Sequence, residues 1–252
     1  NADLAFQQGR DSDAREILED FKPVADSMPR DAYTAYQRWY FYGLDGNQEE
    51  SDQACLDAVL GGGVGGFLIE ECLKEPTAEL AVSRLNLLTK DKDMHTAEGR
   101  IIRAHLLARA GAPKQQIIDL ITPILQERSP LIRRHAVTTL CLVCETEEIR
   151  RYANQARIPQ SANYEQVDDV WQDEQILNYL AAGQISDDLD ARSKDHCITL
   201  SSVCFTSGML KLAAGDPEGA KEEFHRAVFE GSISASDYHM AKAYLRLLTE
   251  DR

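Results

Sequence analysis

The most constraining feature of this 252-residue sequence is a set of small and large apolar residues at fixed spacing near its C-terminal end. The set consists of Gly208, Ala220, Phe224 and Ala227. Small side chains let two helices approach closely, and a large ring fills the space where they diverge. Gly215 is suited to end the first helix, and Asp216 to cap a second helix that starts at Pro217. The pattern predicts two antiparallel helices joined by a tight turn.

This unit resembles a tetratricopeptide repeat (TPR), in which small and large residues alternate in the same way between paired helices. Five family positions match, whereas Lys211 stands where the family usually has an aromatic residue. Parts of residues 171–248 also resemble the C-terminal part of bacterial NlpI-type TPR lipoproteins, and residues 131–137 resemble a HEAT-repeat helix. The resemblance implies an all-helical scaffold that docks other proteins and catalyses nothing itself.

The rest of the chain carries helical apolar spacing nearly everywhere and almost no strand signals. We therefore predict an all-α fold, a right-handed superhelical solenoid of antiparallel, TPR-like helix pairs. Residues 1–154 would form a degenerate TPR/HEAT-like array, 155–166 a linker, and 167–252 a C-terminal TPR-like unit with a closing helix from Ser234 to Leu248. The glycine-rich stretch 61–66 lacks the ending of a phosphate-binding loop and is interpreted as a flexible joint.

Composition excludes some classes of partner. The net charge of −15 disfavours nucleic acid, whose phosphates attract Lys and Arg. No apolar run is long enough to span a membrane. The first residues have the pattern of the end of a helix that began earlier. We therefore expect this sequence to be a piece of a longer protein. The six cysteines do not suggest a disulfide framework, and this favours a reducing, cytoplasmic compartment over a periplasmic or membrane-tethered one.

No catalytic, cofactor-binding or metal-binding residues are predicted. Cys141 and Cys144 have C-x-x-C spacing, but no second pair of ligands completes a zinc site, so we expect two buried thiols on a helix. The six histidines are scattered and match no catalytic motif. The adjacent carboxylates at 168–169 and 187–188 are interpreted as first-turn residues of helices, where the helix dipole favours negative charge.

A basic middle segment suggests one kind of partner. Residues 100–157 contain ten basic and five acidic residues, so this block carries +5 while the remainder carries −20. Four of its arginines are predicted to bind an acidic segment of another protein or peptide. They are Arg100, Arg103, Arg133 and Arg134. Two alternatives stay open: solvated faces with no specific role, or internal contacts between the two halves of the chain.

Two apolar sets suggest further contact points. An aromatic helix at 33–42 offers Tyr36 and Trp39 as interface anchors, although one of its faces must be core. Family positions that line the groove fall on Ser202, Phe205, Met209 and Leu212, of which Phe205 and Met209 are taken as partner-binding. Their apolar character predicts either an amphipathic guest or coverage by the closing helix.

The function expected from these patterns is a non-catalytic interaction scaffold that binds a partner protein or peptide on its concave groove. The alternative is a structural, self-associating segment of a larger bacterial protein, in which the groove is filled by its own C-terminus or by a second copy in a homodimer. An enzyme is the distant third possibility.

Overall fold

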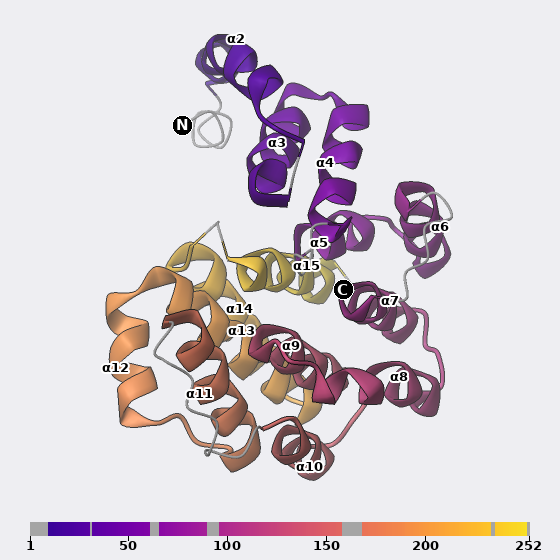
Figure 1. The fold of residues 1–252 in the computed structure, drawn as a ribbon, viewed down its shortest axis with the longest axis vertical. Helices are drawn as coiled ribbons and strands as arrows, with labels where there is room; N and C mark the ends of the chain where they lie inside the picture. Colours follow the sequence, from indigo (N-terminus) through magenta and orange to yellow (C-terminus); the bar gives the residue numbers. More distant parts are fainter. Residues whose placement is uncertain are drawn as a thin grey trace. The chain divides into compact units, whose positions relative to one another are not determined.

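The computed structural model describes residues 10–30, 32–60, 66–89, 96–157, 168–232 and 235–250. Every regular element within these ranges is a helix (Figure 1), so the predicted all-α class is confirmed. The chain divides into two compact units, one formed by residues 1–65 with 86–92 and the other by 66–85 with 93–252.

The helices are named in chain order. The first unit contains α2 (Asp11–Ser27), α3 (Ala32–Asp45) and α4 (Gln48–Leu60). The helices that follow are α5 (Gly66–Leu73), α6 (Ala78–Thr89), α7 (Ala97–Arg109), α8 (Lys114–Ile121), the short 3₁₀ helix η1 (Thr122–Gln126), α9 (Pro130–Leu140), α10 (Thr146–Ala156), α11 (Asp168–Ala182), α12 (Asp187–Asp195), α13 (Cys197–Ala213), α14 (Pro217–Phe229) and α15 (Ser236–Glu250).

The first unit is built from α2 packed on α3, and α3 paired with α4. Ala14, Leu18 and Ala25 on α2 are buried against Phe41 and Tyr42 on α3. The aromatic helix predicted over residues 33–42 is α3, and it extends to Asp45. Gly46 follows with a φ of 77°, a left-handed conformation that glycine adopts without strain.

The helix pair predicted at the C-terminal end of the chain is present as α13 and α14. Gly215 has a φ of 77° directly after α13, and the Asp216 side chain accepts a hydrogen bond from the Gly219 N–H at 2.9 Å. Ala220, Phe224 and Ala227 are all fully buried. The local geometry of this unit therefore follows the predicted pattern residue by residue.

The predicted closing helix is α15, and it joins segments far apart in the sequence. It packs on α13 and α14 and also on α5, the first helix of the second unit (Figure 1). The backbone N–H of Gly66 donates a hydrogen bond to Ser236 Oγ at 3.1 Å. Stacking between sequence neighbours alone does not produce this pairing, so the right-handed solenoid stays a prediction.

Two local expectations change in detail. The helical apolar spacing of residues 117–125 predicts one helix that Pro123 should kink, whereas α8 ends at Ile121 and the proline lies in the first turn of η1. Cys141 and Cys144 were placed inside a helix, but α9 ends at Leu140 and both follow it in a turn. Ser129 caps the start of α9, where its Oγ accepts a hydrogen bond from the Ile132 N–H at 3.4 Å.

The predicted boundary at 155–166 does not separate two compact units. Helix α10 ends at Ala156 and α11 begins at Asp168, and the two helices pack against each other within the second unit. Residues 158–166 of the expected linker lie outside the described residues, as do residues 61–65 of the expected glycine joint. The chain passes between the two units after residues 65, 85 and 92.

Candidate functional site

Two of the four arginines predicted to dock an acidic partner are buried. Arg133 and Arg134 on α9 are only 1% and 2% exposed. Arg134 donates to a carboxylate oxygen of Asp173 at 2.6 Å and to one of Asp237 at 3.0 Å. Arg133 pairs with Glu174. The expectation that these two arginines meet an incoming segment is therefore wrong, because their guanidinium groups already bind carboxylates of the same chain.

The alternative that the basic block makes internal contacts is confirmed for this pair. Asp173 lies on α11 and Asp237 on α15, so Arg134 links α9 to both helices. Burial opposes the charge of Arg134, but the two carboxylates outweigh it and raise its pKa above the ordinary value. On α7, Arg103 is exposed and Arg100 half-buried, so the structure divides the predicted set into two surface and two internal residues.

The predicted groove residues are covered by the chain itself. Phe205 and Met209 are fully buried, and the Phe205 ring lies 6.0 Å from that of Phe224. The Phe224 ring in turn lies 5.9 Å from Tyr244 on α15. These two residues are consequently not an open docking site, because they are buried inside the chain, where Phe205 faces Phe224 of α14.

The aromatic helix α3 offers less surface than its sequence indicates. Trp39 is 5% exposed, because it packs in the first unit, and its expected role as an accessible anchor is wrong. The side chain of Tyr36 lies outside the described residues. Every aromatic side chain that the structure describes on α3 has a smaller exposed fraction than the apolar residues Ile17, Phe21 and Val24 on α2.

Helix α2 carries a row of exposed apolar side chains beside its buried ones. Ile17, Phe21 and Val24 are 40%, 39% and 47% exposed. Their spacing of four and three residues places them along one line on a helix. We call these three residues the α2 outer row. In the sequence, Val24 could have revealed this row. Together with Ile17 and Phe21 it forms a line along the helix that is separate from the buried residues.

Carboxylates border the outer row on the side away from the core. At 100° per residue, Asp13, Glu16 and Asp20 lie beside the row, and all three are exposed. Arg10 donates to a carboxylate oxygen of Asp13 at 2.9 Å. Lys22 lies on another side of α2 and donates to Asp45 at the end of α3. The outer row is thus an apolar line with an acidic margin.

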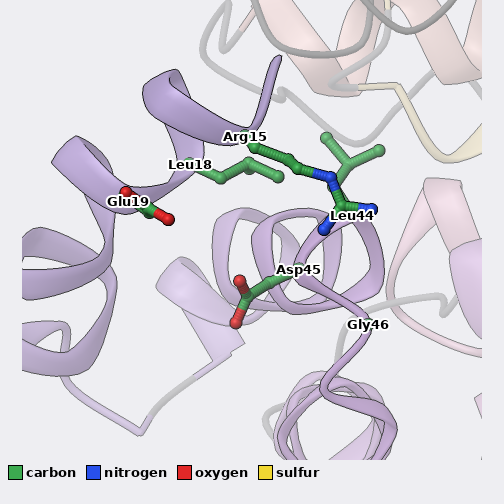
Figure 2. A pocket seen from close by; sticks show the side chains of 6 residues that line it. All are labelled: Arg15, Leu18, Glu19, Leu44, Asp45 and Gly46. Atoms are coloured by element: carbon green, nitrogen blue, oxygen red, sulfur yellow. The ribbon is translucent and has the colours of Figure 1, made fainter. Parts of the chain in front are cut away.

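A cleft lies on the other flank of α2, between this helix and the end of α3. Figure 2 shows Arg15 and Leu18 reaching from α2 toward Leu44, with Asp45 nearby. The cavity has a volume of about 310 Å³ and is also lined by Glu19 and Gly46. Its lining combines two leucines with one basic and two acidic side chains.

A second, polar cavity of about 210 Å³ is lined by residues of α2, α3 and α4 and of the turns between them. Its groups bond to one another: Tyr42 donates to Asp26 at 2.8 Å, and Arg38 donates to Glu50 at 3.4 Å. Burial and the bond to Asp26 raise the pKa of Tyr42 to about 12. These pairs fasten α3 to α2 and α4, and the cavity is therefore a structural feature of the first unit.

Several histidines in the second unit are buried where α15 contacts other helices. His105 Nδ1 lies 2.6 Å from Tyr244 Oη, and burial lowers the pKa of His105 to about 3. His239 Nδ1 lies 2.7 Å from Glu70 Oε2. Although burial disfavours the Glu70 carboxylate, the bond from His239 and the charge of Lys242 lower its pKa to about 2. These groups hold α15 against α7 and α5.

The thiols of the C-x-x-C pair are both buried, and burial raises the pKa of Cys141 and of Cys144. Across the described residues, no group of three or more His, Cys, Asp or Glu side chains is placed to hold a metal ion. None of the helices that the structure describes is both long and apolar enough to cross a membrane.

Comparison of the chain with protein-family models, with curated proteins and with solved structures gives no match.

Proposed function

We propose that this chain is a non-catalytic protein-interaction scaffold, and that the α2 outer row is the surface on which a partner segment binds. The observation that carries the proposal is the alignment of Ile17, Phe21 and Val24, each more than a third exposed, on one helix. Scattered apolar residues are normal on a protein surface, but an aligned set with a polar margin is typical of an interaction site.

The helix pair α13–α14 supports a TPR-like scaffold in particular. Its small and large residues, its turn glycine and its capping aspartate have the arrangement of that repeat. Since Phe205 and Met209 of this repeat are fully buried, the partner site that we propose lies in the first unit and not in the groove of the last repeat. Stacking of such pairs into a right-handed solenoid belongs to the same proposal.

A selection from a displayed library of amphipathic helical peptides tests this function. The native chain and the variant Ile17→Ser/Val24→Ser are immobilised in parallel; Phe21 is kept because its ring lies 5.6 Å from that of Phe41. Removing two half-exposed anchors forfeits about 2 kcal/mol of apolar burial, so selected peptides should bind the variant at least tenfold more weakly. Peptides that bind both proteins equally would contradict the proposed site, provided that both melt at the same temperature.

A second candidate is a structural, self-associating segment whose groove is filled by its own chain. The position of Tyr244 beside Phe224, over the repeat that contains Phe205, favours it. The molar mass from light scattering distinguishes the two candidates. A mass of 28.2 kDa that does not change with concentration supports the scaffold, whereas a dimer that forms in the absence of any partner supports the structural segment.

A further inference from the structure

We infer that the occupant of the α2 outer row is a basic amphipathic helix of another protein. This inference depends on the proposed function and adds the chemistry of the partner. The outer row offers apolar contact, and the exposed carboxylates of Asp13, Glu16 and Asp20 lie along one margin of it. A partner that covers the row would place the side chains at the edge of its own contact surface next to these carboxylates. Lys or Arg in that place is attracted to the carboxylates, whereas Asp or Glu is repelled by them.

The dimensions of the outer row fit a helix. Ile17 and Val24 are seven residues apart, so the row extends about 10 Å along α2, or two helical turns. A partner helix with apolar residues at the same spacing presents a matching line, and its basic residues one position to the side face the acidic margin. Asp13 also bonds to Arg10, so Glu16 and Asp20 are the carboxylates on which the selectivity should depend most.

Two other occupants lack the required charge. The first nine residues of the chain contain Leu4 and Phe6, but their only charged side chain is that of Asp3. They could supply apolar cover without complementing the carboxylates. A second copy that docked symmetrically through the same face, with the two α2 helices antiparallel, would set the carboxylates of one α2 against those of the other. The acidic margin therefore favours a separate partner.

The test compares three labelled 18-residue peptides by fluorescence anisotropy. The first is an amphipathic helix of Leu and Lys, the second replaces every Lys by Glu, and the third scrambles the first so that its Leu residues no longer align. Each is titrated with the native chain, with Ile17→Ser/Val24→Ser and with Glu16→Lys/Asp20→Lys. A matched control, Glu127→Lys/Glu222→Lys, makes the same change in net charge at exposed positions of the second unit.

We expect the Leu/Lys helix to bind the native chain at least tenfold more tightly than either other peptide. Both α2 variants should weaken this binding at least tenfold, whereas the control variant should change it less than twofold. Raising the salt from about 0.05 M to about 0.5 M should weaken binding to the native chain more than to Glu16→Lys/Asp20→Lys, because the salt screens the marginal carboxylates.

Other outcomes overturn the inference in distinguishable ways. Equal binding of the scrambled peptide would mean that the net charge of the chain attracts any cation. Equal binding of the Leu/Glu helix, still lost in Ile17→Ser/Val24→Ser, would refute the basic partner and leave the proposed function standing. If no helix depends on Ile17 and Val24, both fail. A concentration-dependent dimer that Glu16→Lys/Asp20→Lys abolishes would assign the row to a second copy.

Discussion

A Cβ atom placed on Gly208 would lie 2.4 Å from Cε1 of Phe224, a distance that real side chains do not tolerate. The two residues lie on α13 and α14, and both are buried. Phe224 can occupy this space only because position 208 carries no side chain. The contact gives the reason for the small-and-large pattern from which the helix pair was predicted.

Gly208→Ala should destabilise the chain by about 1–3 kcal/mol, because the added methyl group overpacks a filled core. Gly43→Ala is the matched control. It lies inside α3, where its Cβ would meet only Ser51 Oγ at 3.8 Å, and alanine is the better helix former by about 1 kcal/mol. Urea unfolding followed by circular dichroism should move in opposite directions for the two variants. A Gly208→Ala protein as stable as the native one would refute the tight contact.

Arg134→Met should lower the free energy of unfolding by about 3–5 kcal/mol, since it removes a cation that Asp173 and Asp237 bind inside the protein. Arg103→Met removes an exposed arginine of the same basic block and should change stability by less than about 0.5 kcal/mol. Chemical denaturation of the two variants under one set of conditions makes the comparison. Equal losses would show that Arg134 is not the internal link described here.

Stability should fall as the pH is lowered from about 6.5, because His105 and His135 are buried in the neutral form. Burial lowers the pKa of His105 from 6.5 to about 3, and burial together with Arg134 does the same for His135. Between these values the unfolded chain binds protons that the folded chain excludes, so each histidine contributes a slope of up to about 1.4 kcal/mol per pH unit.

The free energy of unfolding should be measured at several pH values between 6.5 and 5. This range isolates the effect of the two histidines from that of Glu70, because the ordinary pKa of Glu70 is 4.5. His105→Gln should reduce the slope by the contribution of one histidine, up to about 1.4 kcal/mol per pH unit. An unchanged slope in His105→Gln would contradict the buried, neutral state of that ring.

One thiol per native chain should react quickly with a disulfide reagent. Cys197 is exposed, whereas the other five cysteines are buried, and burial raises the pKa of Cys204 to about 12. Because the thiolate is the reactive form, the buried thiols should react only on unfolding. Cys197→Ser should abolish the fast phase. A second fast thiol, from Cys141 or Cys144, would show that the turn after α9 is more open than described.

The sequence predicts those parts of the fold that depend on neighbouring residues. The turn at Gly215, the cap at Asp216 and the burial of Phe224 all follow from residues within about one helical turn of each other or on adjacent helices. Backbone conformation and capping are local properties, so their signals lie in short motifs.

What the sequence does not reveal depends on partners far along the chain. In the sequence, Arg134 has the pattern of a surface cation. Its partner Asp237 lies 103 residues later, and only the folded structure brings the two together. The contact between Gly66 and Ser236 spans 170 residues, and no local pattern indicates it. The candidate site was missed for a different reason: Ile17 and Leu18 are neighbours in the sequence, but 100° of helical rotation places one at the surface and the other in the core.

Chemical-shift mapping of isotope-labelled protein with the Leu/Lys helix will locate the partner surface residue by residue. We predict that the largest amide shifts cluster at Ile17, Phe21 and Val24 and along the acidic margin at Glu16 and Asp20, and that Glu16→Lys/Asp20→Lys removes them. Shifts concentrated instead around Phe205 and Met209 on α13, with α2 unaffected, would contradict the α2 outer row as the binding surface and return the site to the groove of the last repeat.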